Sequence, residues 1–546
     1  MSRSERHWLL GYAILILLLT SIPYVIAFQA TSSQTPVRLW SFSGFLFGVE
    51  DGNSYIAKMR RGMEGEWLFR SPYSGMEQRG LLAFFPYYLL GKLAGGTASH
   101  EQLVILFHWF RIGASLLCVY ATYLFLREFL ESVFFKRVAL VVITLGGGLG
   151  WIALLFQTNA FLPLEFFSPE AFGFLSLYGL PHLSLARALL LFALVEYLHL
   201  WRDTDKRKRN SIIWRLGLFW LGAGLSQPIH AGILAIVIFL HLAAMVIVSR
   251  LNSYRKPDWR DVKRIIPSVI LASLPVLILL AYTSVGFFTE PYLKIWALQN
   301  RLPTPHISLY LLSYGWLVPL LIGGVYRARL LNREKRLLLF IWMGSAFVLI
   351  FTPISIQRRL IEGVWVVIIV FSFLFLESLS AALRQWSRQI GLILLLFSLP
   401  SSFILLAGGI RSGMSFSTPI FFPAGHVAGL EFLNQQREAK NAIVLASYQT
   451  SNALPAYAFV RVIIGHGPES PNNDVIAEDV ERFFQAKTPD SFRREFIRQH
   501  RIDYIIWGAA EKELGDWQPS LESYLTPLYE NQELTIFEVV RAKITP

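Results

Sequence analysis

Long apolar runs separated by short polar stretches dominate the first 410 residues of this 546-residue chain. A run of about 20 apolar residues crosses the hydrocarbon core of a bilayer as a helix. About eleven such spans are predicted. They lie at 8–28, 103–126, 138–156, 183–200, 212–227, 229–249, 265–288, 307–326, 337–354, 363–383 and 390–410. The break at Gln227-Pro228 predicts two helices, and one kinked helix is the alternative, because proline interrupts the helical hydrogen-bond ladder.

The first apolar run, from Trp8 to Phe28, also raises the question of a signal peptide. The apolar core of a signal peptide has only about 7–15 residues, whereas this run has the length of a full membrane span. We therefore expect an uncleaved first span.

The distribution of basic residues predicts the orientation in the membrane. Arg3 and Arg6 precede the first span, and further basic segments follow spans two, four, six, eight and ten. These segments are Lys136-Arg137, RDTDKRKRN, SYRKPDWRDVKR, RARLLNREKR, and Arg384 with Arg388. All of them fall on one face if the N-terminus is cytoplasmic, as the positive-inside rule requires. An odd number of spans then places the C-terminal region outside the cytoplasm.

The C-terminal region has a different pattern, in which β-rich runs alternate with polar helical stretches. The β-rich runs are AIVLAS at 442–447, VRVIIG at 460–465, IDYIIWG at 502–508 and LTIFEVV at 534–540. This alternation predicts a small α/β domain. We therefore expect an α-helical polytopic membrane domain at 1–410, with a long outer loop at 29–102, and an extracytoplasmic α/β domain at 411–546. No glycine-rich nucleotide fingerprint accompanies the strands, so no nucleotide cofactor is assigned.

Composition agrees with a multi-pass membrane protein. The chain is 54% hydrophobic and 16% charged, whereas soluble proteins carry about 25% charged residues. The net charge of +13 does not indicate nucleic acid, because the basic residues lie in short loops between apolar runs. A single cysteine, Cys118, excludes an intramolecular disulfide and a cysteine-based zinc or redox motif.

The first outer loop contains an acidic pair, Glu50 and Asp51. Tyr55, Met59 and Met63 follow at helical spacing, which predicts a short amphipathic helix lying on the membrane. A carboxylate at a helix N-terminus is favoured by the helix dipole, so a capping role is one interpretation of Asp51. The functional interpretation is a general base that takes the proton from an acceptor hydroxyl.

A second group of polar residues lies in the segment PLEFFSPEAFGFLSLYGLPHLSLAR. Glu170 and His182 are candidates for holding a divalent metal, Mg or Mn, or a sugar. The alternative is that both are interfacial polar residues satisfied by water or backbone. Arg187 lies inside a predicted span, where a charge usually faces a partner or a polar cavity. His230, beside Pro228 at the helix break, is a further candidate cavity residue.

The third feature is the basic pair Arg358-Arg359, in the segment ISIQRRLIEGVW on the predicted outer face. Arginine binds phosphate with two parallel hydrogen bonds, so this pair suits the phosphate of a lipid-linked donor. Snorkelling to ordinary lipid headgroups is the alternative. Glu362 offers one of the two arginines a local partner.

Three short stretches, together with the order of spans and loops, carry a resemblance to a known family. They are the acidic pair followed by AKMRRG, the segment PEAFGFLSLYGLPH, and QRR. The chain's expected layout is a first span that begins in the cytoplasm, then a long outer loop, and at the end an outer α/β domain. In this layout the chain resembles the GT-C superfamily of membrane glycosyltransferases. The bacterial members related to protein mannosyltransferases and lipid A aminoarabinose transferases are the most similar.

This resemblance implies an inverting transfer of a sugar from a polyprenyl-phosphate donor to an acceptor hydroxyl at the outer face of the cell membrane. By analogy, Asp51 with Glu50 would be catalytic, and Arg358 and Arg359 would bind the donor phosphate. The partners implied are the lipid-linked donor, membrane lipids and an acceptor that is a glycan, a lipid or a protein. The sequence lacks a WWDYG-type motif, so transfer of a whole oligosaccharide to asparagine is not expected.

Two other classes of function remain as alternatives. A transporter or lipid flippase would distribute polar groups through its spans and often show internal symmetry. The sequence shows no convincing repeat, and its distinctive polar residues cluster on the predicted outer side. A non-catalytic scaffold with the same fold is the second alternative, because fold does not establish function.

Overall fold

The computed structural model describes residues 1–33, 39–156, 162–251 and 259–544. The chain divides into two compact units. The first, here called the helical unit, comprises Met1–Ser21, Phe110–Tyr282 and Leu302–Gly408. The second, here called the mixed unit, comprises Ile22–Trp109, Thr283–Arg301 and Gly409–Pro546. The mixed unit thus contains most of the predicted first outer loop together with the C-terminal region.

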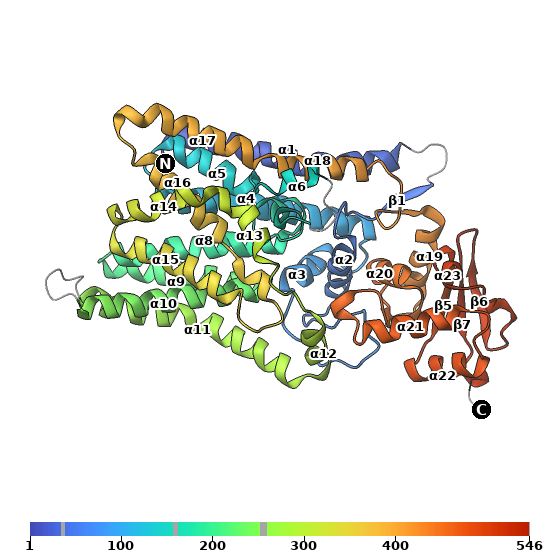
Figure 1. Cartoon of the computed structure of the whole chain (residues 1–546). Helices are drawn as coiled ribbons and strands as arrows, with labels where there is room; N and C mark the ends of the chain where they lie inside the picture. The colour runs from blue at the N-terminus through green and yellow to red at the C-terminus, as the bar shows by residue number, and fades with distance from the viewer. Residues whose placement is uncertain (34–38, 157–161, 252–258, 545–546) are drawn as a thin grey trace. The chain divides into compact units, whose positions relative to one another are not determined.

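The helical unit is built from long apolar helices, some of which continue into the mixed unit (Figure 1). Their bounds are α1 (Arg3–Ser32), α4 (His100–Arg127), α5 (Val133–Leu145), α6 (Gly150–Leu155), α7 (Phe174–Gly179), α8 (Pro181–Arg202), α9 (Lys206–Ser226), α10 (Pro228–Leu251), α11 (Trp259–Thr289), α13 (Ile307–Tyr314), α14 (Val318–Arg327), α15 (Arg333–Leu349), α16 (Val364–Glu377), α17 (Arg384–Ser398) and α18 (Pro400–Ser412). Short 3₁₀ turns, at Leu164–Phe166 and Gln357–Ile361 among others, connect them.

Within the described residues, eight helical segments are long and apolar enough to cross a membrane. They are Arg3–Ser32, His100–Arg127, Pro181–Arg202, Pro228–Leu251, Trp259–Thr289, Ile307–Leu330, Gln357–Glu377 and Ala381–Ser412. Of the other three predicted spans, 212–227 and 337–354 overlap α9 and α15, whereas 138–156 is interrupted, because α5 ends at Leu145 and α6 begins at Gly150. Of these, α5 has 13 residues and α15 has 17, less than the roughly 20 that span a bilayer without distortion. The polytopic helical fold class is confirmed, and the count of eleven spans stays a prediction.

The chain breaks at Gln227 into two helices. The indole nitrogen of Trp220 in α9 donates a hydrogen bond to the carbonyl of Ala231 in α10 over 3.1 Å. Eleven residues along one straight helix would separate these groups by roughly 16 Å. The chain therefore reverses direction here, as the two-helix interpretation predicts. The basic segment that follows α10 lies partly at 252–258, outside the described residues.

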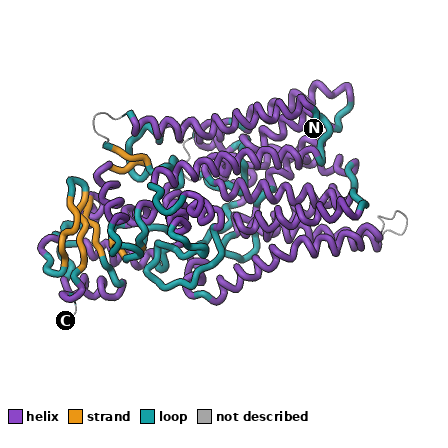
Figure 2. The backbone as a smooth tube through the Cα atoms, turned by 180° about the vertical axis from the view of Figure 1, so that it is seen from behind, coloured by secondary structure: helices purple, strands orange, loops and turns teal. Residues whose placement is uncertain are grey.

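The mixed unit combines helices with two small sheets, whose strands are orange in Figure 2. Its further helices are α2 (Val49–Met63), α3 (Phe85–Ala94), α12 (Pro291–Gln299), α19 (Ala424–Gln435), α20 (Tyr448–Tyr457), α21 (Asn473–Phe484), α22 (Asp490–His500) and α23 (Ala509–Leu514). Its strands are β1 (Trp40–Phe42), β2 (Phe421–Pro423), β3 (Ile443–Leu445), β4 (Arg461–Val462), β5 (Tyr504–Gly508), β6 (Leu525–Glu530) and β7 (Leu534–Val539).

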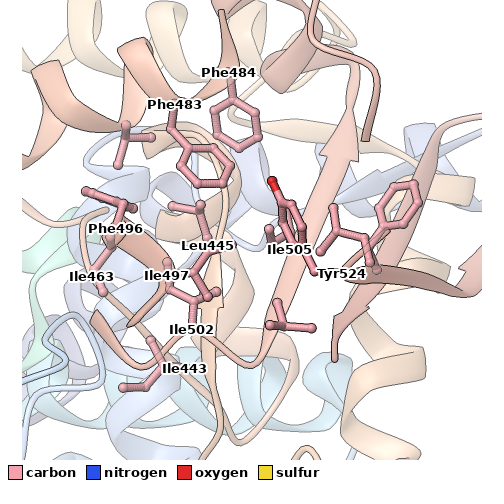
Figure 3. Packing of buried hydrophobic residues seen from close by; sticks show 14 of the residues in the cluster. Ile443, Leu445, Ile463, Phe483, Phe484, Phe496, Ile497, Ile502, Ile505 and Tyr524 are labelled. Atoms are coloured by element: carbon pink, nitrogen blue, oxygen red, sulfur yellow. The ribbon is translucent and has the colours of Figure 1, made fainter. Parts of the chain in front are cut away.

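The larger sheet has the strand order β4-β3-β5-β7-β6. Strand β3 pairs in parallel with β4 and β5, whereas β7 pairs antiparallel with β5 and β6. The four β-rich runs of the sequence form β3, β4, β5 and β7. Apolar side chains from β3, β5, β6 and β7 and from α21 and α22 contribute to one buried cluster, which includes Phe483, Phe496 and Ile505 (Figure 3). The predicted α/β character of the C-terminal region is confirmed.

Helix α2 corrects one expectation from the sequence. The predicted amphipathic helix on the membrane surface is instead buried within the mixed unit, where it packs against α3 and α20. The close packing has a steric cause, because Gly62 of α2 and Gly91 of α3 leave no room for a side chain against the facing backbone. Even Lys58 and Arg60 are buried. The acidic pair therefore begins a rigid helix of the protein core.

Candidate active site

Glu50 and Asp51 lie in the first turn of α2. Gly48 precedes the helix in the left-handed conformation, with φ of 55°, which glycine adopts at little cost. The residue at the N-cap position is this glycine, which has no side chain to cap the helix. The helix dipole still favours negative charge in this turn. The side chain of Asp51 is 57% exposed, which leaves it accessible to a reactant.

Asp51 contacts a histidine from the C-terminal region. Nε2 of His466 lies 3.2 Å from Oδ1 of Asp51, although 415 residues separate the two along the chain. Only 8% of the His466 side chain is exposed, so the imidazole contacts the carboxylate from its buried side. The pair thus joins an accessible acid to a buried, ionisable ring.

Glu50 plays a different structural part from its neighbour. Its Oε1 accepts a hydrogen bond of 2.6 Å from the Tyr448 hydroxyl and one of 2.8 Å from the backbone nitrogen of Gly467. Gly467 is the residue directly after His466. Glu50 therefore holds the loop that carries His466, whereas Asp51 contacts the His466 ring itself.

A buried ion pair secures the same loop at its other end. Nζ of Lys58 lies 2.6 Å from Oε1 of Glu469, and the two side chains are 0% and 3% exposed. Ser54 and Ser71 also donate hydrogen bonds to this carboxylate, over 2.9 and 2.8 Å. The Tyr292 hydroxyl binds the backbone carbonyl of Glu469 over 3.0 Å. The segment 466–470, HGPES, is thus held from α2, from α12 and from the loop after α2.

Electrostatics in this region favour a charged imidazole. Burial alone would lower the pKa of His466, but the negative charge of Glu469 and the hydrogen bond and charge of Asp51 outweigh it and raise that pKa. Burial would likewise raise the pKa of Glu469, and the charge of Lys58 reverses this and lowers it. Neighbouring groups of opposite charge, His466 with Glu469 and Glu469 with Lys58, therefore stabilise one another's charged forms.

The helical unit contains a second ionic group, centred on Glu362. Nε and Nη2 of Arg187 donate to the two carboxylate oxygens of Glu362 over 2.6 and 2.8 Å, which is a bidentate fork. Arg187 also donates to the backbone carbonyls of Phe172 and Pro169. Arg187 thus has the partner that a charge inside a span requires. The expected pairing of Glu362 with Arg358 or Arg359 is wrong, because Arg187 occupies its carboxylate.

His230 belongs to this buried group. Its Nε2 lies 3.2 Å from Oε2 of Glu362, and both side chains are 1% exposed. The angles fall outside hydrogen-bond geometry, and the contact is an ion pair only when the ring is protonated. The proposed cavity role of His230 and Arg187 stays a prediction.

Arg358 and Arg359 have different surroundings, although they are adjacent in sequence. Nε of Arg359 lies 3.4 Å from Oε1 of Glu170, whose side chain is 4% exposed. The guanidinium of Arg358 lies 5.0 Å from the ring centre of Phe167. Nε of Arg358 and Oε2 of Glu170 are buried and have no hydrogen-bond partner among the residues that the structure describes. Polar groups with spare hydrogen-bonding capacity therefore gather beside the predicted phosphate-binding pair.

The metal prediction concerns Glu170 and His182. His182 lies in the first turn of α8 and is buried. Among the described residues, no group of three or more His, Cys, Asp or Glu side chains is arranged to hold a metal. Glu170 already has Arg359 as a cationic neighbour.

Sequence reasoning did not find His466, Glu469 or Lys58 as members of the site. Lys58 stood within the AKMRRG stretch, where a lysine among apolar residues was a usable signal. His466 and Glu469 gave no comparable signal, because the segment HGPES resembles an ordinary turn.

No family model matches the sequence, and no curated protein matches it. Solved structures do match. The oligosaccharyltransferase of Archaeoglobus fulgidus, tethered to an acceptor peptide, gives a TM-score of 0.58 at 12% identity, covering 92% of this chain and 69% of that one.

Two further structures extend the comparison. ArnT from Cupriavidus metallidurans, bound to undecaprenyl phosphate, gives a TM-score of 0.50 at 11% identity, covering 96% of this chain and 98% of that one. The mycobacterial arabinofuranosyltransferase AftD gives 0.53 at 12% identity, covering 98% of this chain and 42% of that one. The chain has the fold of the GT-C membrane glycosyltransferases.

Proposed function

We propose that this protein is an inverting glycosyltransferase that moves a sugar from a polyprenyl-phosphate donor to an acceptor hydroxyl. The observation that carries the proposal is Asp51, an accessible carboxylate at a helix N-terminus, backed by the buried His466. The fold adds support at the level of architecture. A base held in a fixed position is what an acceptor hydroxyl needs to become a nucleophile.

The proposed step is a single displacement. Asp51 takes the proton from the acceptor hydroxyl while the acceptor oxygen forms a bond to the anomeric carbon. The bond from that carbon to the phosphate oxygen breaks, and its electron pair leaves with the polyprenyl phosphate. The leaving group is good, so no covalent enzyme intermediate is needed, and the sugar inverts its anomeric configuration.

The donor phosphate needs a cationic site, and Arg358 and Arg359 are the proposed residues. ArnT is bound to undecaprenyl phosphate in its structure, and one structure of the Archaeoglobus enzyme contains a dolichol-phosphate. A lipid phosphate is therefore the ligand class we propose for this chain. The guanidinium groups would stabilise negative charge that builds on the leaving phosphate.

A divalent ion held by Glu170 and His182 stays a prediction. Two protein ligands with donor phosphate oxygens are a common arrangement for Mg²⁺. The pairing of Glu170 with Arg359 and the absence of a third ligand among the described residues do not favour it. No step of the proposed reaction depends on a metal.

The proposed orientation has a cytoplasmic N-terminus and an extracytoplasmic C-terminal region, in a plasma membrane. Only this arrangement puts the basic loops inside. A reporter fused at Asp205, in the loop before α9, should report the cytoplasm, and one fused after the C-terminus should report the outside. A cytoplasmic signal from the C-terminal fusion would contradict the eleven-span arrangement.

Asp51→Asn tests the proposed function, because it keeps the size of the side chain and removes its ability to accept a proton. The purified protein in lipid nanodiscs is given a panel of undecaprenyl-phosphate-linked hexoses and pentoses with a crude envelope extract as acceptor. Release of undecaprenyl phosphate is measured. We expect the wild type to release it and Asp51→Asn to lose about 100-fold or more, the contribution typical of a general base.

The controls separate this proposal from its alternatives. Glu50→Gln removes the charge of the adjacent acid but not the proposed base, so it should retain more activity than Asp51→Asn. A flippase would move the intact donor between leaflets of a proteoliposome without releasing undecaprenyl phosphate. A scaffold would do neither. Near-normal release by Asp51→Asn would exclude Asp51 as the base.

A further inference from the structure

We infer that His466 is a positioning residue for the catalytic carboxylate, and that it keeps Asp51 ionised and correctly oriented under mildly acidic conditions. The inference rests on the proposed function, since it assigns His466 a part in the same reaction. It also implies a role for the C-terminal region in the reaction, because His466 belongs to that region.

The contact geometry is the first argument. His466 Nε2 is 3.2 Å from Asp51 Oδ1, and the imidazole is buried whereas the carboxylate is more than half exposed. A buried ring loses little freedom when it binds an exposed side chain. His466 therefore acts as the fixed member of the pair and Asp51 as the member that meets the acceptor.

The loop around His466 is the second argument. Within the segment 466–470, Gly467 binds Glu50, Glu469 binds Lys58, and Ser470 binds Gln299. The hydroxyl of Ser470 also accepts a hydrogen bond from the backbone nitrogen of His466 over 3.2 Å. The segment that follows the histidine is thus anchored at three residues, and the histidine backbone is bound to the last of them. Such fixed support is what holds a reacting group within a few tenths of an ångström.

The charges around the ring are the third argument. The groups that face His466 are Asp51 and Lys58 from α2, Glu469 from its own loop, and Tyr73, whose ring centre is 5.4 Å away. Lys58 and Glu469 form a pair of their own. Glu469 and Asp51 both carry negative charge that raises the pKa of His466, and Asp51 is the one of the two that is hydrogen-bonded to the ring. A positive charge at this distance favours the ionised carboxylate of Asp51.

This arrangement has a consequence for the dependence of activity on pH. A carboxylate base is lost when it is protonated, so kcat/KM falls on the acidic side. The imidazolium opposes that protonation. Without its charge, the acidic limb moves to higher pH. At alkaline pH the histidine itself becomes neutral, so its charge no longer contributes and the difference disappears.

The experiment compares kcat/KM against pH for the wild type, His466→Gln and His466→Ala, with release of undecaprenyl phosphate from the donor panel as readout. Glutamine keeps a hydrogen-bond donor but no charge. We expect the acidic limb of His466→Gln to move up by about one pH unit and to converge with the wild type at high pH. His466→Ala should lose activity at every pH, because positioning is lost as well. His426→Gln is the control, since His426 is also a buried histidine of the mixed unit.

A second measurement does not use turnover. The imidazole signals of isotope-labelled protein are titrated by NMR, and the His466 signal is identified by its loss in His466→Gln. In Asp51→Asn, we expect the midpoint of His466 to fall, because one of the two negative charges that raise its pKa is gone while Glu469 remains. The midpoint of His500, which lies in α22 away from this loop in sequence, should stay unchanged.

The outcomes separate the inference from the proposed function. If the wild type releases no undecaprenyl phosphate, the proposed function fails, and the catalytic part of His466 fails with it. If the wild type is active but both His466 variants lower kcat/KM uniformly with an unshifted acidic limb, only the inference is overturned. An unchanged His466 midpoint in Asp51→Asn would also overturn it.

Discussion

Two carboxylates, one in each compact unit, lie at the same distance from a histidine but have opposite surroundings. Asp51 of the mixed unit and Glu362 of the helical unit each lie 3.2 Å from an imidazole Nε2. Asp51 is 57% exposed, whereas Glu362 is 1% exposed and is held by the bidentate fork of Arg187. The first carboxylate can meet a reactant, and the second has its oxygens engaged by the protein.

The difference in exposure and in partners separates a carboxylate that can react from one that holds the structure together. A charge buried without water must be compensated by neighbours, and removal of one partner leaves the other uncompensated. Arg187 additionally binds the carbonyls of Pro169 and Phe172, so it joins the segment before α7 to the segment before α16. We therefore expect changes at Glu362 to affect stability and changes at Asp51 to affect turnover.

The largest effect on stability is expected from Arg187→Met. Loss of one partner of a buried pair costs about 3–5 kcal/mol. The double variant Arg187→Met/Glu362→Leu should recover much of that loss, because it leaves no buried charge unpaired. Unfolding by SDS in mixed micelles measures both. Arg215→Met is the matched control, since Arg215 forms the same fork with Glu196 over 2.8 and 2.9 Å but is 44% exposed.

An exposed pair contributes only about 0–1 kcal/mol. If Arg187→Met destabilised the protein no more than Arg215→Met, the distinction between the two carboxylates would lose its basis.

An intermediate effect is expected at the donor phosphate. Replacing Arg358 or Arg359 with Ala should reduce kcat/KM by an amount equivalent to about 2–4 kcal/mol if the residue stabilises the leaving phosphate. Lys keeps the charge but not the planar fork, so Lys variants should lie between Ala and the wild type. Each of the four variants is measured separately with the same donor. Snorkelling predicts that Lys serves as well as Arg, so full activity in both Lys variants would support that alternative.

The smallest effect is expected from removal of divalent metal. Glu170 has Arg359 as its neighbour, and the described residues supply no three-ligand site. Turnover in chelator, with and without restored Mg²⁺ or Mn²⁺, should differ little, because Arg359 already supplies a positive charge beside Glu170. A complete loss that metal reverses would assign Glu170 and His182 to a metal site.

Much of the fold follows from local pattern. Apolar runs predict the helices, and the break at Gln227 follows from the proline after it. Strand β6 was not predicted, because it contains Pro527 and most of its side chains are exposed or half-buried, which masks the alternation of a strand. Helix α2 was predicted from its spacing, but its burial was not, since that depends on packing against α3 and α20.

The candidate site was predictable only in part. Glu50 and Asp51 were recognisable as neighbouring acids at a helix start, and Arg187 as a charge that needed a partner. The partner of Asp51 lies 415 residues away, and no local pattern connects two such distant residues. Glu362 was recognised, but its partner was misassigned, because sequence proximity to Arg358 and Arg359 is weaker than the geometry that brings Arg187 to it.

The most direct test of the central claim is the anomeric configuration of the transferred sugar. The wild-type protein is given an undecaprenyl-phosphate sugar of one defined anomer, and the anomeric configuration of the product, which is fixed in a glycoside, is determined by proton NMR. A single displacement with Asp51 as base predicts a product of inverted configuration, formed by the wild type and lost in Asp51→Asn. A product of retained configuration, or equal formation by the variant, would contradict the account.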